Sequence, residues 1–121
     1  MKISKIKSYA KINLALNITG KKKLLHKIES IVSFIDLYDD ISINEIKKNK
    51  HQISFYGKFS KKIAKNNTVK KLFLILDNKN LLKGRKFKIK IKKNIPQEAG
   101  LGGGSMNAAN VFNYLIKKKF L

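Results

Sequence analysis

The sequence contains no cysteine and a single proline among its 121 residues. The lack of cysteine excludes a disulfide framework and a thiolate metal site, and two histidines, His26 and His51, are too few for a zinc cluster. No apolar run approaches the roughly 18 residues of a membrane-spanning helix. The N-terminal residues also lack the apolar core and cleavage site of a signal peptide, so we expect a cytoplasmic protein.

Acidic residues are scarce as well: 7 Asp and Glu stand against 28 Lys and Arg, which gives a formal net charge of +21. One interpretation is a basic module that binds nucleic acid or an acidic membrane. The other is compositional bias, because an AT-rich coding sequence enriches Lys, Ile and Asn together. Arg85 is the only arginine, whereas nucleic-acid readers rely on arginine and stacking aromatic residues. The composition therefore favours bias over specific nucleic-acid binding, and in both cases the positive field attracts phosphate-bearing ligands.

Hydrophobic residues make up 43% of the chain, which suits one small globular domain. Apolar segments, most of them alternating with polar residues, predict strands over residues 9–18, 27–37, 41–46, 51–57 and within 84–96. In the last of these, Phe87, Ile89 and Ile91 face inward. Residues 38–40 separate two of the strands, and Asp39 is predicted to shape a turn there.

Helical spacing of apolar residues occurs in two places. Residues 66–78 carry apolar side chains at i, i+3, i+4 and i+7, with Asn67 or Thr68 as the N-cap. The last segment, from about Ser105, is predicted to bury one face made of Ala108, Val111, Phe112, Leu115 and Ile116. The order of strands, helix, strand, glycine-rich loop and helix predicts an α+β domain with a mixed sheet packed on helices.

The glycine-rich loop is the most informative motif. Gly100, Gly102, Gly103 and Gly104 lie between Pro96 and the start of the last helix. Glycines let backbone N–H groups approach an oxyanion without a Cβ in the way, and a helix start adds unpaired N–H donors and a positive dipole end. The alternative is a tight, flexible turn, but a turn needs only one or two glycines. The pattern therefore favours phosphate binding.

Two common phosphate-binding fingerprints do not fit this loop. The dinucleotide-binding motif requires glycine three residues after Gly102, where this sequence has Ser105. The P-loop requires Lys followed by Ser or Thr after its last glycine, where this sequence has Ser105 and Met106. The loop is therefore neither a Rossmann nor a Walker loop.

Residues 96–109, "PQEAGLGGGSMNAA", resemble the nucleotide loop of the GHMP kinases. Two further segments, "SYAKINLALNITGK" and "LLHKIESIVSFIDLYDDISI", are similar to the N-terminal motifs of one branch of that family. The resemblance implies a GHMP kinase N-terminal domain with the ribosomal protein S5 domain 2-like fold. It also implies a kinase that uses ATP and Mg2+ to phosphorylate the 2-hydroxyl of a cytidine-diphosphate-linked methylerythritol, in the non-mevalonate route to isoprenoid precursors.

The resemblance also implies roles for individual residues. Lys11 matches the active-site lysine, and Asn13 and His26 match substrate-binding positions. The ATP phosphate loop corresponds to Pro96, Gln97, Glu98, Ala99, Gly100, Leu101, Gly102, Gly103, Gly104, Ser105 and Met106. Lys11 and Asn13 are two residues apart, so they share one face if their segment is a strand. No protein ligand is assigned to the metal.

The sequence departs from the family pattern at several positions. Leu24 and Leu25 replace a Gly-Tyr pair before His26, Lys27 replaces a glutamate, and Met106 replaces a second loop serine. The family's general-base aspartate and its C-terminal domain have no counterpart, so residues 1–121 are expected to form an incomplete, C-terminally truncated domain. This leaves a truncated or inactive kinase, a non-catalytic nucleotide-binding remnant, or a chain complemented by a separate C-terminal half.

Overall fold

The computed structural model describes residues 2–10, 37–63, 67–96 and 103–121. They form a four-stranded sheet in the order β1-β2-β4-β3 and two helices. The sheet is mixed, as predicted: β1–β2 and β2–β4 are antiparallel, and β3–β4 is parallel. The elements are β1 (Ser4–Tyr9), β2 (Tyr38–Ile46), β3 (Gln52–Tyr56), α2 (Thr68–Asn78), β4 (Lys86–Lys92) and α3 (Gly103–Lys117).

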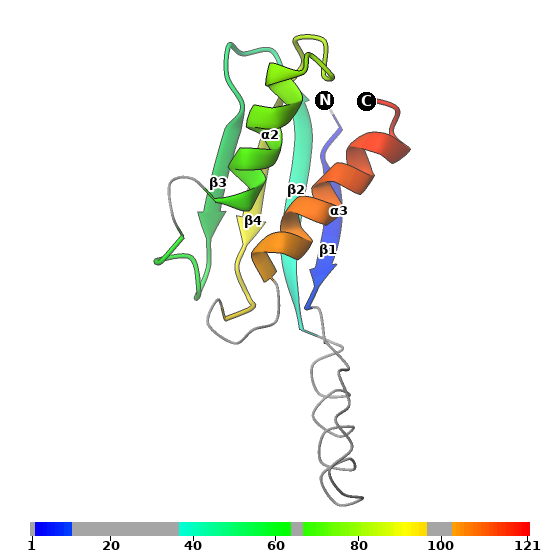
Figure 1. The fold of residues 1–121 in the computed structure, drawn as a ribbon. Helices are drawn as coiled ribbons and strands as arrows, with labels where there is room; N and C mark the ends of the chain where they lie inside the picture. The colour runs from blue at the N-terminus through cyan, green and yellow to red at the C-terminus, as the bar shows by residue number, and fades with distance from the viewer. Residues whose placement is uncertain (1, 11–36, 64–66, 97–102) are drawn as a thin grey trace, which may run out of the picture.

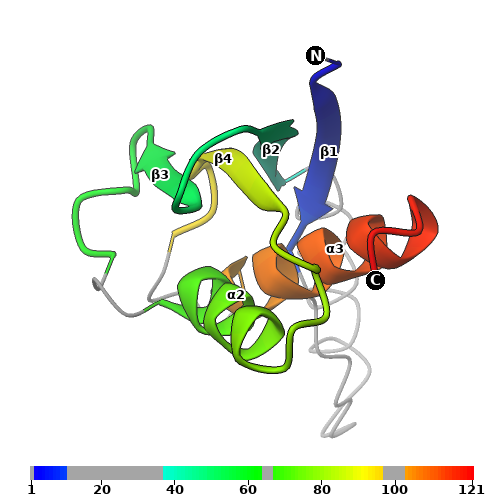
Figure 2. The same ribbon diagram turned by 90° about the horizontal axis from the view of Figure 1, so that it is seen from above.

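Both helices cover the same face of the sheet (Figures 1 and 2). Helix α2 connects the parallel strands β3 and β4 and packs below them, while α3 lies beside α2 under β1 and β2. A two-layer α+β domain of this kind buries one face of the sheet against the apolar stripes of the helices. No helix in the described part of the chain is long and apolar enough to cross a membrane.

The central strands form as their sequences predict. Ile41 and Ile43 of β2 pair with Ile91 and Ile89 of β4, and all four side chains are buried. The lysines of β4 alternate with these residues and lie on the opposite face, because successive side chains of a strand point to opposite sides. The predicted inward positions of β4 are confirmed.

Helix α2 also confirms its sequence pattern. Asn67 is the N-cap, and its side chain accepts a hydrogen bond from the Lys70 backbone N–H at 3.0 Å. Val69, Phe73 and Leu76 are buried. A capping side chain of this type satisfies one of the four N–H groups that a helix start leaves unpaired.

Helix α3 buries fewer of its apolar residues than the sequence predicts. Val111 and Leu115 are fully buried, but Phe112 is 36% and Ile116 50% exposed. The buried stripe runs through Asn107, Val111 and Leu115, four residues apart, so the next residue along is rotated about 100° away from the sheet. The apolar pattern suggested a wider buried face than α3 has.

The N-terminal part of the sheet differs more strongly. The strand predicted over 9–18 lies mostly outside the described residues, as does the one over 27–37, whereas β1 at Ser4–Tyr9 was not predicted. The turn predicted at residues 38–40 is wrong, because these residues begin β2. Asp39 pairs with Ser8 of β1 and continues the inward stripe of Ile43 and Ile41. A buried carboxylate can occupy that stripe only because it is fully hydrogen-bonded, as described below.

Gly57, predicted to end β3, has a φ of +99° directly after the strand. A Cβ there would lie 3.2 Å from both the backbone N and the O of Lys93. Gly84 has a similar φ of +81°, but a Cβ at this position would have no neighbouring atom within 4 Å. A side chain at Gly84 would thus be disfavoured by the positive φ alone, whereas one at Gly57 would be disfavoured by both the positive φ and close packing.

We expect Gly84→Ala to lower the free energy of unfolding by about 1–2 kcal/mol through its positive φ alone. Gly57→Ala should cost about 1 kcal/mol more, because the added methyl group presses on the Lys93 backbone. Urea unfolding followed by circular dichroism measures both. Equal losses for the two variants would show that the contact with Lys93 is readily relieved.

Candidate functional site

Several element ends meet at one end of the domain. Strands β1, β3 and β4 end there, β2 begins there, and both helices start there (Figure 1). Helix starts carry unpaired N–H groups and the positive end of the helix dipole. The residues that flank the glycine-rich loop belong to this end of the domain.

A cluster of buried polar side chains lies at this end. Among the described residues, the buried polar or charged side chains are those of Ser8, Asp39, Lys93 and Asn107, and all four are in one hydrogen-bonded network. The Lys93 ammonium donates to Asp39 at 2.5 Å and to the Asn107 side-chain oxygen at 2.7 Å. The Asn107 amide donates to Ser8 at 2.9 Å and to Asp39 at 3.1 Å. The network joins β1, β2, the segment after β4 and α3.

Asp39 is the centre of this network. Its Oδ1 accepts the backbone N–H groups of Asn94 at 2.7 Å and Ile95 at 2.9 Å. Its Oδ2 accepts from Lys93 and Asn107. Both carboxylate oxygens thus have two donors each, which compensates the burial of a charge. With its oxygens occupied, Asp39 is not available as a catalytic base or as a metal ligand.

The two helix starts are tied to each other. The Thr68 hydroxyl, at the first residue of α2, donates to the Gly104 carbonyl of α3 at 2.8 Å. The first turn of α3 contains no acidic residue. Its first four N–H groups have no partner within the helix, which makes this turn suitable for an anionic ligand. Ser105 is exposed in the same turn and can supply a hydroxyl.

The structure describes only part of the predicted site. Pro96 is half-buried directly after the buried Ile95, Gly103 begins α3, and Gly104, Ser105 and Met106 complete its first turn. The helix starts two residues before Ser105, so Ser105 lies inside the first turn and does not open the helix. The other predicted site residues lie outside the described residues: Lys11, Asn13, His26, Gln97, Glu98, Ala99, Gly100, Leu101 and Gly102.

The segment that contains Lys11, Asn13 and His26 is attached to this end of the domain at both sides. The backbone N–H of Ala10, which follows β1, donates to the carbonyl of Leu37, which precedes β2, at 2.9 Å. Lys11 is the next residue after Ala10. The chain therefore leaves and re-enters the sheet at the end where α3 begins.

The buried network was not predicted from the sequence, although a signal for it exists. Asp39 extends the inward alternation of β2, Lys93 extends that of β4, and Asn107 precedes Val111 by one helical repeat. Each polar residue thus ends a core-facing stripe at the same end of the domain. Polar residues that continue several apolar stripes at one end would have indicated a buried polar cluster.

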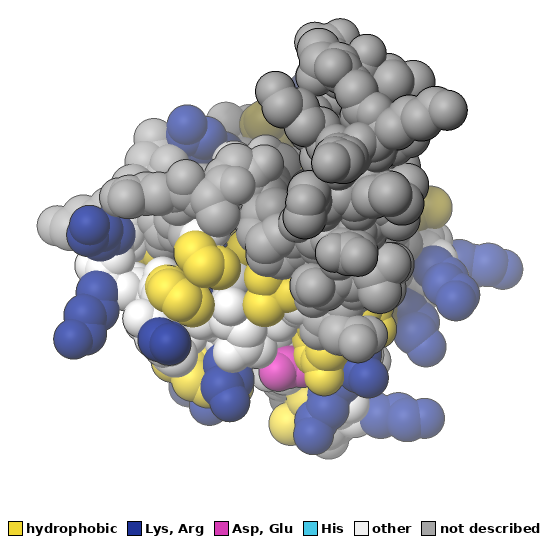
Figure 3. Space-filling view, turned by 90° about the horizontal axis from the view of Figure 1, so that it is seen from below, with side chains coloured by type: hydrophobic (Ala, Val, Ile, Leu, Met, Phe, Trp, Pro, Cys, Tyr) yellow, Lys and Arg dark blue, Asp and Glu magenta, His cyan; other side chains and the backbone are white. Residues whose placement is uncertain are grey.

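Basic side chains surround this end. Figure 3 views the molecule from below, where Lys and Arg side chains project around the rim and acidic ones are sparse. The excess follows from the net charge of +21 over the whole chain. A field of this sign raises the local concentration of phosphate-bearing ligands without selecting among them.

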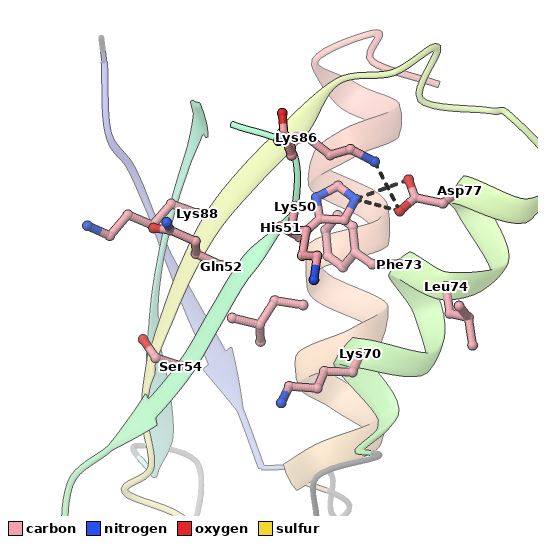
Figure 4. A pocket seen from close by; sticks show the side chains of 12 residues that line it. Lys50, His51, Gln52, Ser54, Lys70, Phe73, Leu74, Asp77, Lys86 and Lys88 are labelled. Carbon is pink, nitrogen blue, oxygen red and sulfur yellow. Dashed lines mark hydrogen bonds and ion pairs between the residues drawn. The ribbon is translucent and has the colours of Figure 1, made fainter. Parts of the chain in front are cut away.

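A second feature is a groove of about 630 Å³ between β3 and α2 (Figure 4). His51 and Asp77 lie at its wall, and the His51 Nε2 is 3.0 Å from each Asp77 oxygen. The His51 Nδ1 accepts the Phe87 backbone N–H at 3.0 Å, so the proton is on Nε2 and is donated to Asp77. Both ring nitrogens are therefore engaged, and we assign this pair a structural role.

The sequence comparisons agree with this fold. The family profile described as "GHMP kinases N terminal domain" matches residues 67–118, which include α2, β4 and α3. The matched part of the chain, which includes the glycine-rich start of α3, is thus similar to the N-terminal domain of the GHMP kinases.

The particular proteins that the chain resembles are 4-diphosphocytidyl-2-C-methyl-D-erythritol kinases. It is 62% identical over 117 residues, 97% of its length, to the one from Pelagibacter ubique (strain HTCC1062), of which it covers 42%. It is 36% identical over 116 residues, 93% of its length, to the one from Ureaplasma parvum serovar 3, of which it covers 43%. The crystal structure of a 4-(cytidine 5'-diphospho)-2C-methyl-D-erythritol kinase is 28% identical with a TM-score of 0.49, covering 68% of this chain and 28% of that one. The chain thus spans less than half the length of these relatives.

Proposed function

We propose that the protein is the ATP-binding part of a kinase that phosphorylates the 2-hydroxyl of 4-diphosphocytidyl-2-C-methyl-D-erythritol. The observation that carries this proposal is the glycine-rich start of α3, held beside the start of α2 by the bond between Thr68 and Gly104. The identity of 62% to a kinase named for that substrate supports the same conclusion. The product would serve isoprenoid precursor synthesis by the non-mevalonate route.

In this proposal the backbone of residues 96–106 binds the phosphates of ATP. The N–H groups of Gly103 and Gly104 and the hydroxyl of Ser105 would contact phosphate oxygens at the helix start. Mg2+ would arrive with the nucleotide and supply charge neutralisation, because the buried Asp39 has no free oxygen to offer it. Phosphoryl transfer depends mainly on positioning and charge stabilisation, which a first-turn cradle provides.

Three residues before β2 complete the proposed site. Lys11 would stabilise the negative charge that develops during transfer, and Asn13 and His26 would bind the cytidine-linked substrate. Support for Lys11 comes from its neighbour Ala10, which is bonded to Leu37 at the end of the domain where α3 begins. Residues 1–121 would form the N-terminal domain, and the general base and the C-terminal domain would come from a separate half.

The proposal is tested by the formation of ADP and phosphorylated substrate from MgATP. The 121-residue chain is mixed with the C-terminal part of the Pelagibacter ubique relative, and turnover is compared with a Lys11→Ala variant. We expect Lys11→Ala to lower kcat about 100-fold or more. The matched control is Lys5→Ala, an exposed lysine of β1, which should behave as the wild type.

Two results would contradict the kinase. One is full activity in the Lys11→Ala chain, and the other is the absence of substrate-dependent ADP formation in the complemented mixture. Binding of duplex DNA that decreases steeply with salt and survives deletion of residues 100–104 would instead support a basic nucleic-acid-binding module.

A further inference from the structure

We propose that Asp39, Lys93 and Asn107 are positioning residues that hold the two flanks of the glycine-rich loop in a fixed relation. We call this set the flank clamp. It touches no proposed ligand, because Asp39 and Asn107 are 0% exposed and Lys93 is 3% exposed. Its effect on nucleotide binding rests on the proposed function, whereas its effect on the flanks does not.

The clamp works through the two oxygens of one carboxylate. The Asp39 Oδ1 holds the upstream flank through the N–H groups of Asn94 and Ile95 at 2.7 and 2.9 Å. The Asp39 Oδ2 holds the downstream flank through the Asn107 amide at 3.1 Å. Lys93 belongs to the upstream flank and reaches across to the Asn107 oxygen at 2.7 Å. One side chain on β2 is therefore bonded to both ends of the loop.

The placement of these bonds matters for a phosphate site made of backbone N–H groups. Such groups cannot adjust individually, since each is fixed by the path of the main chain. A displacement of about 1 Å between a bound group and its partner can reduce a rate about 100-fold. Asn107 lies one turn into α3, so its bonds set the distance and direction of the helix start relative to Pro96.

Stability alone does not explain a clamp of this composition. Hydrophobic residues of similar volume often replace a buried ion pair without loss of stability. The neighbouring positions of the same stripes, Ile41, Ile91 and Val111, are apolar and fully buried. The polar residues lie where these stripes reach the loop flanks, and there Asp39 accepts two main-chain N–H groups that an apolar side chain could not satisfy.

The test exchanges the carboxylate and the amide between positions 39 and 107. Asp39→Asn places an amide nitrogen against the Lys93 ammonium, and Asn107→Asp places a second carboxylate beside Asp39. In the double variant Asp39→Asn/Asn107→Asp, the new amide oxygen can still accept from Asn94 and Ile95. Its nitrogen can donate to the new carboxylate, which also accepts from Lys93. The double variant loses the bond between Lys93 and residue 39, but it keeps the same net charge and gives the Lys93 ammonium a carboxylate partner at position 107.

We expect each single variant to weaken MgATP binding about 10- to 100-fold and the double variant to bind within about threefold of the wild type. Titration calorimetry measures the Kd at a temperature where circular dichroism shows every protein folded. Asn113→Ala, an exposed asparagine of the same helix, is the matched control and should bind as the wild type. Wild-type affinity in both single variants, or a double variant no better than they are, would overturn the proposal.

Amide hydrogen exchange at Asn94 and Ile95, followed by NMR, tests the clamp without nucleotide. Exchange should be faster in Asp39→Asn and slow again in the double variant, and unchanged exchange would show that Asp39 does not hold the upstream flank.

If Asp39→Asn does not fold, Asn107→Ala provides the comparison: it keeps the ion pair and should weaken MgATP binding while exchange at Ile95 stays slow. A wild-type chain that binds no MgATP would contradict the proposed function, and the exchange measurements would still decide whether the clamp exists.

Discussion

Lys93→Met is expected to lower the free energy of unfolding by about 3 kcal/mol. Removing one partner of a buried ion pair typically costs ~3–5 kcal/mol because the other charge stays buried without compensation. Here the lower end applies, since Asp39 keeps the N–H groups of Asn94, Ile95 and Asn107 as donors. Domains have a total stability of only about 5–15 kcal/mol, so the loss should be plain in urea unfolding followed by circular dichroism.

The control for this prediction is the double variant Lys93→Met/Asp39→Asn. It removes both charges and keeps an oxygen for the Asn94 and Ile95 N–H groups, while the new amide nitrogen can donate to Asn107. We expect it to recover to within about 1 kcal/mol of the wild type, because neutral replacement of a buried pair is often without cost. A double variant that is as unstable as Lys93→Met would mean that packing of the Lys93 side chain, and not its charge, supports the fold.

Phe87→Ala should cost about 3–5 kcal/mol, the usual range for truncating a fully buried aromatic side chain. Phe87 is 1% exposed on β4 and is surrounded by other rings. Its ring centroid is 6.2 Å from that of Phe73 and 5.2 Å from that of Phe120. The cavity left by the substitution would lie between the sheet, α2 and the chain end, where no single element can move to fill it. The midpoint of urea unfolding measures the loss.

Phe112→Ala provides the matched control, because it removes the same ring from an exposed position of α3. We expect it to change the stability by less than about 1 kcal/mol. A large loss for Phe112→Ala would show that this side chain is buried in solution, either against another copy of the chain or against a partner. A small loss for Phe87→Ala would show that the core around β4 is loosely packed.

The sequence was sufficient to predict β3, β4, α2 and the part of β2 from Ile41 onward, because each has an apolar pattern with a single period and clear breaks. Gly57 ends β3, and Asn67 caps α2. The mixed pairing of the sheet is consistent with the succession of elements, since the helix between β3 and β4 allows them to run parallel. Local pattern and tertiary structure agree in this part of the chain.

Strand β1 and the buried position of Asp39 could not be predicted from local apolar patterns. Strand β1, "SKIKSY", is short and rich in lysine and serine, so its pairing with β2 outweighs a weak intrinsic preference. Asp39 looked like a turn residue because aspartate favours turns, but four hydrogen bonds place it in the core. These bonds come from residues 54 to 68 positions further along the chain, which a local window cannot include.

The glycine-rich loop could be predicted from its residue types and its resemblance to a family. The residues that hold its two flanks could not. A glycine run at a helix start indicates phosphate binding because glycine has no Cβ to keep an oxyanion away from the backbone N–H groups. The residues that hold its flanks are an aspartate, a lysine and an asparagine, and each is common on protein surfaces. Only their burial and mutual bonding in the folded chain distinguish them.

The long sequence separation within the buried network has a consequence for the order of folding. Ser8 and Asn107 are 99 residues apart, and Ser8 and Asn110 are 102 residues apart. During synthesis β1 and β2 are available for pairing long before α3 leaves the ribosome, and Asp39 lacks its Asn107 donor until α3 is present. Closing so long a segment costs conformational entropy that local contacts cannot repay in advance. The end of the domain proposed to bind nucleotide is therefore completed last, when the helix that starts at the loop docks on strands already formed.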